Sequence, residues 1–355
     1  MDLKTLLSLA IESDATDLHI TVNSPPVLRI NGQLMPVEER VLNKEDTEDL
    51  LMSILTERQK SIFERDQAID LAYTHNNSAQ ASRFRANIYC QRGCMAAAFR
   101  RLADHIPSLD ELNLPESLYN MCSIQDGMIL VTGPTGSGKT STLAALIDKI
   151  NRTTPSHIIT IEDPVEYIFH HKKSLVNQRE LYTDVPSFAD GLRSALREDP
   201  DVILVGEMRD LETMRTAIMA AETGHLVLAT LHTRDATSTI SRIVGVYPSD
   251  EQEQIAHQLS LALKAVVSQK LLRRKDGKGR VPAIEIMKIT PGIGNMIRQH
   301  KSEQIRSVIE TGASQGMQSM EYSLSRLFRE GKIDRDTALR NARDIGYIER
   351  LMKQP

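Results

Sequence analysis

The chain has 355 residues, which favours about two domains, and 41% of them are hydrophobic, which is ample for packed cores. The formal net charge of −4 gives no bulk attraction to nucleic acid, so a nucleic-acid partner is not expected. No apolar run approaches the roughly 18 residues of a membrane span, and the first residues lack a signal-peptide pattern, so a cytosolic protein without a transmembrane segment is expected.

The first hundred or so residues predict a small α+β domain. Apolar side chains at helical spacing predict a helix over residues 3–11, and Asn31-Gly32 favours a tight turn between two strands. Further helices are expected after the capping residues Asn43 and Thr56. Three more strands are expected at about residues 69–73, 83–89 and 96–102. No nucleotide motif occurs in this part of the sequence.

From about Gly127 the pattern changes to alternating strands and helices, which is typical of an α/β domain with a parallel sheet. The candidate strands are residues 128–132, 158–161, 202–205, 226–230 and 281–287. Past Pro291 the chain is expected to be mostly helical. The predicted division is a small domain over 1–104, a linker over 105–120, an α/β core over 121–290 and a helical region over 291–355.

A phosphate-binding loop lies between the first core strand and a helix. The pattern G-x-x-x-x-G-K-[ST] is matched by Gly133-Pro134-Thr135-Gly136-Ser137-Gly138-Lys139-Thr140. Such a loop turns its N–H groups toward phosphate oxygens, while Lys139 can reach the β- and γ-phosphates and Thr140 can bind Mg²⁺. These residues and Ser141, which opens the helix, are the predicted site for ATP and Mg²⁺.

Two carboxylate segments follow predicted strands. Glu207 comes after the apolar strand 202–205, at the edge of the sheet that should carry the phosphate loop. A carboxylate there can orient or deprotonate the attacking water, or hold Mg²⁺ through water. Glu162, Asp163 and Glu166 follow another strand and repel one another unless a cation such as phosphate-bound Mg²⁺ lies among them. For any one of these three, a solvated acidic turn is the alternative.

Two histidines bracket the predicted strand 226–230. His225 and His232 are seven residues apart, which is too far for one metal ion. His232 lies at the carboxyl end of the strand, where ligands bind in open α/β sheets, so geometry favours it over His225. A separate basic cluster is predicted to be a solvated loop and comprises Lys270, Arg273, Arg274, Lys275, Lys278 and Arg280.

Taken together, these motifs resemble the secretion ATPase superfamily, and most closely its type IV pilus retraction ATPases (PilT-type). The likeness runs from residues 13–19 through Arg83-Phe84-Arg85 and the phosphate loop to an Asp box at 161–166, an atypical Walker B at 206–210 and a His box at 224–232. It implies a PAS-like N-terminal domain, a RecA-like ATPase domain and a homohexameric ring. It also implies a cytoplasmic motor at the inner membrane that contacts a membrane-platform protein, with a second retraction ATPase as a further partner.

The resemblance also implies roles for single residues. Glu207 is the Walker B glutamate, Glu166 is the Asp-box glutamate, and both His225 and His232 neighbour the active site. Arg85 and Arg100 are fifteen residues apart on adjacent predicted strands, similar to the paired arginines that reach the nucleotide from the N-terminal domain. We expect them at the phosphates, either within one chain or across a subunit boundary. Surface salt bridges are expected for the neighbouring arginines, Arg83, Arg92 and Arg101.

The segment 292–299 matches the family's C-terminal motif Ala-Ile-Arg-Asn-Leu-Ile-Arg-Glu only at Ile293, Asn295, Ile297 and Arg298. This departure leaves room for an accessory retraction ATPase (PilU-type). Two alternatives of other classes are a nucleotide-gated regulator without motor activity and a nucleic-acid translocase. The intact phosphate-loop and carboxylate motifs argue against the regulator, and the acidic charge balance argues against the translocase.

Overall fold

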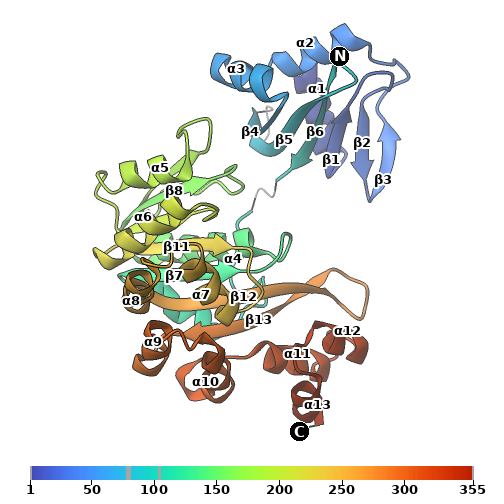
Figure 1. Cartoon of the computed structure of the whole chain (residues 1–355). Helices are drawn as coiled ribbons and strands as arrows, with labels where there is room; N and C mark the ends of the chain where they lie inside the picture. The colour runs from blue at the N-terminus through green and yellow to red at the C-terminus, as the bar shows by residue number, and fades with distance from the viewer. Residues whose placement is uncertain (1, 77–80, 103–104, 354–355) are drawn as a thin grey trace. The chain divides into compact units, whose positions relative to one another are not determined.

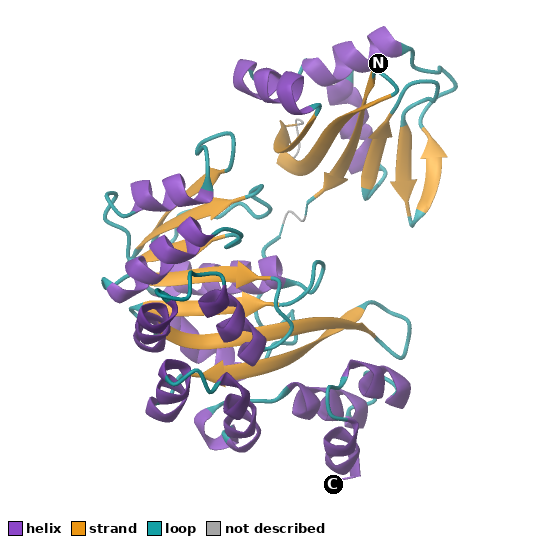
Figure 2. Ribbon diagram, viewed as in Figure 1, coloured by secondary structure: helices purple, strands orange, loops and turns teal. Residues whose placement is uncertain are grey.

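The computed structural model describes residues 2–76, 81–102 and 105–353. The chain divides into two compact units (Figures 1 and 2). The N-terminal unit contains residues 1–106 together with 162–168 and 179–186, and the core unit contains the rest. These units differ from the expected domains because the two short segments group with the N-terminal unit and the helical region 291–355 groups with the core.

The N-terminal unit packs three helices against a six-stranded antiparallel sheet of order β3-β2-β1-β6-β5-β4 (Figure 1). The predicted helix caps at Asn43 and Thr56 are confirmed, and each is a capping box. Apolar side chains such as Leu7, Phe84 and Phe99 form the core of this unit. Its elements are α1 (Leu3–Glu12), β1 (Asp17–Ile20), β2 (Val27–Ile30), β3 (Gln33–Pro36), α2 (Lys44–Met52), α3 (Glu57–Asp66), β4 (Ala68–Asn76), β5 (Ala81–Gln91) and β6 (Cys94–Arg101).

The core unit is built on a seven-stranded sheet of order β13-β12-β7-β11-β10-β8-β9. Strands β12, β7, β11, β10 and β8 are parallel, and β13 is antiparallel to β12. The middle strands are buried on both faces, as their continuous apolar runs predict. The strands are β7 (Gly127–Thr132), β8 (His157–Glu162), β9 (Leu175–Glu180), β10 (Val202–Val205), β11 (Leu226–Leu231), β12 (Leu263–Arg273) and β13 (Arg280–Lys288).

Helices cover both faces of this sheet. Right-handed crossovers that run in opposite directions place α4 on one face and α6 to α8 on the other (Figure 1). The parallel order therefore brings the carboxyl ends of β7, β10 and β11 to one edge of the sheet. The helix before the first core strand is η1 (Glu116–Ser123), and those between the core strands are α4 (Lys139–Thr153), α5 (Phe188–Ala195), α6 (Leu211–Glu222), α7 (Ala236–Gly245) and α8 (Gln252–Ala262).

The predicted helical C-terminal region is confirmed. Its last helices pack on β12 and β13 through a small apolar core that includes Leu272, Val281, Leu324 and Ile348. Among the described residues, no helix has both the length and the apolar character needed to cross a membrane. The C-terminal elements are α9 (Pro291–Arg298), η2 (Ser302–Gln304), α10 (Ile305–Thr311), η3 (Ala313–Gln315), α11 (Met320–Arg329), α12 (Arg335–Asn341) and α13 (Ile345–Lys353).

Two strands, β9 and β12, are absent from the sequence-based prediction. Strand β12 follows α8 directly from Ala262 to Leu263, without the Gly or Pro that usually marks a boundary. The prediction of a loop is therefore wrong at Lys270 and Arg273, which lie in β12, and at Arg280, which begins β13. The Lys270 amine donates a hydrogen bond to the Asn341 carbonyl at 2.8 Å, so this basic residue ties β12 to the C-terminal region.

A buried carboxyl on β13 makes the stability of the core depend on pH. Burial raises the pKa of Glu285 from 4.5 to about 7, and the nearby Asp235 and Glu321 raise it further against the opposing hydrogen bond from the Ala236 N–H. The pKa of Glu285 is higher in the folded than in the unfolded protein, so the protonated carboxyl stabilises the folded state. This stabilisation is complete below pH 4.5 and is lost as the pH rises toward 7. The loss amounts to about 3 kcal/mol at most.

Replacing Glu285 by Gln is expected to remove this dependence, since the amide oxygen can still accept from Ala236. The melting temperature of Glu285→Gln should equal or exceed that of the wild type at pH 8, and the difference should shrink or reverse at pH 5. Thermal denaturation at the two pH values measures it. An equal difference at both would show that Glu285 does not titrate in this interval.

Candidate functional site

The phosphate loop has a backbone that requires glycine at two positions. Gly133 has φ 147°, and a Cβ there would lie 2.3 Å from the Gln269 carbonyl oxygen. Gly138, with φ 88°, is the N-cap of α4. Ser137 is 2% exposed, and its buried hydroxyl has no hydrogen-bond partner within the described chain. A buried orphan hydroxyl in a loop that ends at a helix N-terminus fits a phosphate ligand.

Lys139 is held by the loop itself. Its amine donates to the carbonyls of Gly133 at 2.9 Å and Pro134 at 3.2 Å, and the residue is 8% exposed. Burial lowers the pKa of Lys139, and the negative charge of Glu207 opposes that change. Nucleotide phosphates can replace the two carbonyls as partners of this amine. Thr140 and Ser141 follow in the first turn of α4, where the helix dipole also favours an anion.

Strand β12 braces the loop from the neighbouring position in the sheet. The Thr142 hydroxyl donates to the Gln269 side chain at 2.7 Å, and the Thr132 hydroxyl donates to Ser268 at 2.9 Å. A Cβ on Gly138 would come within 2.8 Å of the Gln269 amide nitrogen. Sequence reasoning missed Gln269 because the strand that carries it was not predicted.

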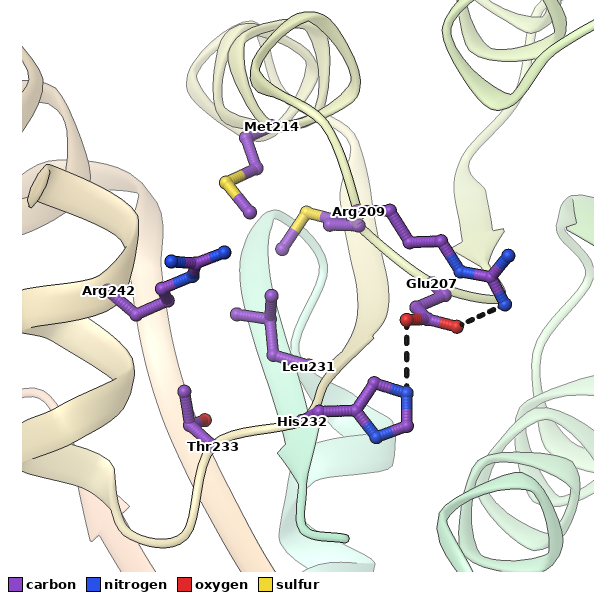
Figure 3. Close-up of a pocket in the computed structure, with 8 residues that line it drawn as sticks. Glu207, Arg209, Met214, Leu231, His232, Thr233 and Arg242 are labelled. Carbon is purple, nitrogen blue, oxygen red and sulfur yellow. Dashed lines mark ion pairs between the residues drawn. The ribbon is translucent and has the colours of Figure 1, made fainter. Parts of the chain in front are cut away.

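Glu207 and His232 meet at the carboxyl edge of the sheet (Figure 3). One carboxylate oxygen of Glu207 lies 3.0 Å from His232 Nε2, and the other lies 2.8 Å from Arg209 Nη2. The two contacts fix the orientation of the carboxylate, whose side chain remains 19% exposed. A fixed, partly exposed carboxylate can act on a water molecule.

A pocket of about 400 Å³ opens beside this cluster. Met208, Met214 and Leu231 give it apolar walls, and Arg242 from α7 lines it as well (Figure 3). Strand pairing positions the cluster, because Leu204 on β10 is in register with Leu228 on β11. Sequence reasoning missed Arg242, since nothing in its helical pattern distinguishes it from a solvated residue.

His225 lies at the opposite end of β11. Its Nδ1 is 3.0 Å from the Ala220 carbonyl oxygen at the end of α6. The strand between the two histidines is fully buried and separates them by roughly 20 Å. The structure therefore does not bring His225 to Glu207 within the chain, and a role for it there stays a prediction.

Residues 162–166 of the Asp box belong to the N-terminal unit. Both backbone groups of Val165 are held, since its N–H donates to Glu180 at 3.2 Å and its carbonyl accepts from Arg83 Nε at 2.8 Å. Arg83 and Glu180 also form a 2.6 Å ion pair with side chains only 19% and 7% exposed. The expected surface salt bridge at Arg83 is thus wrong, because this arginine is largely buried and fixes the residue before Glu166.

The paired arginines lie directly opposite each other, because the register of β5 and β6 matches Arg85 with Arg100. Arg100 Nε is 3.0 Å from Asp17, and Arg85 is 3.8 Å from Asp70 and 4.0 Å from Glu166. Their side chains are 42% and 72% exposed. Asp17, Asp70 and Glu166 already offset the two opposed positive charges, and the exposure of both side chains leaves them accessible to a further anion.

The described residues contain no group of three or more His, Cys, Asp or Glu side chains able to hold a metal ion. Any Mg²⁺ at Thr140 therefore needs further oxygen ligands from nucleotide phosphates or water. The other predicted Mg²⁺ ligands, Glu162 and Asp163, belong to the N-terminal unit, with Glu162 buried and Asp163 half-buried.

A family described as "Type II/IV secretion system protein" matches residues 1–323. The chain belongs to this family. It is 46% identical over 319 residues to the "Twitching motility protein" of Neisseria gonorrhoeae, covering 90% of this chain and 84% of the relative. It is 43% identical over 343 residues to the "Type IV pilus retractation ATPase PilT" of Pseudomonas aeruginosa, covering 97% and 98%.

A solved structure extends the likeness to three dimensions. The match has a TM-score of 0.90 at 45% identity, covers 99% of each chain, and is titled "Crystal Structure of the Pilus Retraction Motor PilT and Bound ADP". The expected α/β fold class and the resemblance to retraction ATPases are confirmed. This member of the secretion family is therefore a nucleotide-binding ATPase.

Proposed function

We propose that the chain hydrolyses Mg-ATP as a homohexameric motor and that the hydrolysis drives retraction of a type IV pilus. The observation that carries this proposal is the cluster of Glu207, His232 and Arg209 at the sheet edge that also holds the phosphate loop. Each member has a contact that fixes it, and the loop offers Lys139 and the orphan Ser137 hydroxyl to phosphate.

Each residue of the site has a separate role in ATP hydrolysis. The loop N–H groups and Lys139 bind the phosphates of ATP, and Thr140 would hold Mg²⁺, which neutralises phosphate charge when bound. Glu207 orients the attacking water and takes its proton. His232 and Arg209 keep the Glu207 carboxylate in one orientation.

Hydrolysis also requires positive charge at the γ-phosphate. Arg85 and Arg100 lie opposite each other with exposed side chains that can contact an added anion, and we assign them to the phosphates within a chain or between neighbouring subunits. We assign Glu166 to the same site. Partners that fit the proposal are further copies of this chain, a membrane-platform protein at the inner membrane and a second retraction ATPase.

Helix α9 offers a test that separates hydrolysis from retraction. Ile293 and Ile297 are buried, whereas Asn295 and Arg298 are exposed, and Arg298 donates to the Ser260 hydroxyl at 3.1 Å. The exposed pair belongs to the segment 292–299 and is remote in sequence from the phosphate loop. Changing both residues to Ala should leave ATP hydrolysis largely intact while pili stay extended in cells.

Phosphate release by the purified variant and pilus length in cells measure the two activities. The matched control is His300→Ala, an exposed position just past α9 that should keep both. If the double variant lost ATP hydrolysis to the level of Lys139→Ala, the segment would serve the chemistry and the proposed separation would fail.

An accessory retraction ATPase is the second candidate, because segment 292–299 departs from the family motif at four positions. The two candidates differ in cells whose only retraction ATPase is this chain. A main motor retracts pili there, whereas an accessory one leaves them extended.

A further inference from the structure

The segment that joins His232 to α7 is short and tightly bonded. Asp235 caps the helix by accepting from the Ser238 N–H and the Thr237 hydroxyl, both at 2.7 Å. The Thr239 hydroxyl donates to the Asp235 carbonyl at 2.7 Å and lies 2.7 Å from the Thr233 hydroxyl. Because Thr233 directly follows His232, the start of α7 constrains the backbone that carries the His232 ring.

Two other parts of the core unit hold this start of α7. The Ala236 N–H donates to the buried Glu285 carboxyl on β13 at 2.8 Å. Arg343, between α12 and α13, donates through Nη1 to the free oxygen of Asp235 at 3.2 Å. The first contact belongs to the sheet, while the second comes from the C-terminal helices.

Arg343 is itself placed by a buried carboxylate. The backbone N–H groups of Arg343 and Asp344 donate to one oxygen of Glu321 at 3.0 and 3.2 Å. Glu321 is 3% exposed and lies on α11, where the neighbouring Ser323 hydroxyl accepts from Ile284 N–H of β13 at 3.0 Å. The chain around Arg343 is therefore anchored, and its guanidinium is presented to Asp235.

We propose that Arg343 is a positioning residue for ATP hydrolysis, which acts through Asp235 on the start of α7 and so holds His232 against Glu207. The proposal rests on the roles given above to His232 and Glu207. Arg343 lies beyond residues 1–323, the part that the family match covers. The C-terminal helices thereby help to position His232 and Glu207 for ATP hydrolysis.

Two substitutions isolate this ion pair from the rest of the fold. Arg343 is 62% exposed, and the Asp235 carboxylate that Arg343→Ala leaves behind is 24% exposed and still accepts from Thr237 and the Ser238 N–H, so the variant should not unfold the protein. Asp235→Asn keeps a good helix cap and removes the charge that Arg343 contacts, and it also removes the effect of Asp235 that raises the pKa of Glu285. Arg340→Ala is the matched control, since Arg340 is 78% exposed and pairs with Asp336 on its own helix.

Each of Arg343→Ala and Asp235→Asn should lower kcat for ATP hydrolysis by roughly two- to fivefold, the factor that a partly exposed ion pair can supply, with KM for ATP unchanged. The double variant should be no slower than either single one, because both changes remove the same contact. Arg343→Lys should recover part of the loss, and Arg340→Ala should match the wild type. Multiplicative losses in the double variant would overturn the proposal.

Hydrogen exchange gives a readout that needs no turnover. The backbone amides of residues 233–238 should exchange faster in Arg343→Ala and Asp235→Asn, and at the wild-type rate in Arg340→Ala. Faster exchange in a protein that never hydrolyses ATP would support the coupling while contradicting the proposed function. Wild-type exchange and wild-type kcat in Arg343→Ala would overturn the coupling itself.

Discussion

Replacing Lys139 by Ala is expected to abolish ATP hydrolysis and to weaken ATP binding. Lys139 is the only cationic side chain in the phosphate loop, and its amine donates to the Gly133 and Pro134 carbonyls, which nucleotide phosphates can replace as its partners. Removing it leaves the γ-phosphate without its closest charge-assisted hydrogen bond. Phosphate release measures the first effect, and binding of a fluorescent ATP analogue measures the second.

The control for this change is Lys149→Ala. Lys149 lies further along α4, where its ammonium stacks over the Tyr119 ring at 5.4 Å, away from the loop. The control variant should hydrolyse ATP like the wild type, so that a loss in Lys139→Ala cannot be ascribed to damage to the helix. Wild-type turnover in Lys139→Ala would remove the basis for assigning residues 133–140 to phosphate binding.

Replacing Glu207 by Gln is expected to separate ATP binding from hydrolysis. Gln keeps the size of the side chain and can still contact His232 and Arg209, but it cannot take a proton from water. ATP should therefore stay bound while phosphate release falls by roughly 10²–10⁴. Equilibrium binding and single-turnover hydrolysis on the same preparation measure the two quantities.

Glu212→Gln serves as the matched control for the change at Glu207. Glu212 lies at the start of α6, and its side chain is 61% exposed and pairs with Arg193. The Glu212→Gln variant should hydrolyse ATP at the wild-type rate. If turnover persists in Glu207→Gln instead, Glu207 is not the base, and Glu166 becomes the residue to change next.

Local pattern was enough to predict the elements that carry the phosphate loop. A buried apolar run, a glycine-rich turn and a helix start identify β7, residues 133–138 and α4, because each signal lies within a few adjacent residues. The convergence of Glu207 and His232 was also predictable, since both follow parallel strands whose carboxyl ends share one edge.

Contacts between distant segments could not be predicted in this way. The brace from Gln269 depends on β12, whose start carries no boundary signal, and on its register with β7. The burial of Arg83 depends on Glu180, which lies far along the chain. Arg343 reaches Asp235 only because Glu321 anchors the segment before α13. Each of these contacts is set by tertiary packing, which the spacing of residues in the sequence does not predict.

Phosphate release by the purified wild-type protein, with ATP and Mg²⁺ and again with the Mg²⁺ chelated, tests the central claim most directly. The account predicts multiple turnovers that require Mg²⁺ and that disappear in Lys139→Ala. ATP that binds to the wild type and stays intact over the same interval would contradict it, and would identify the chain as a nucleotide-gated regulator rather than a motor.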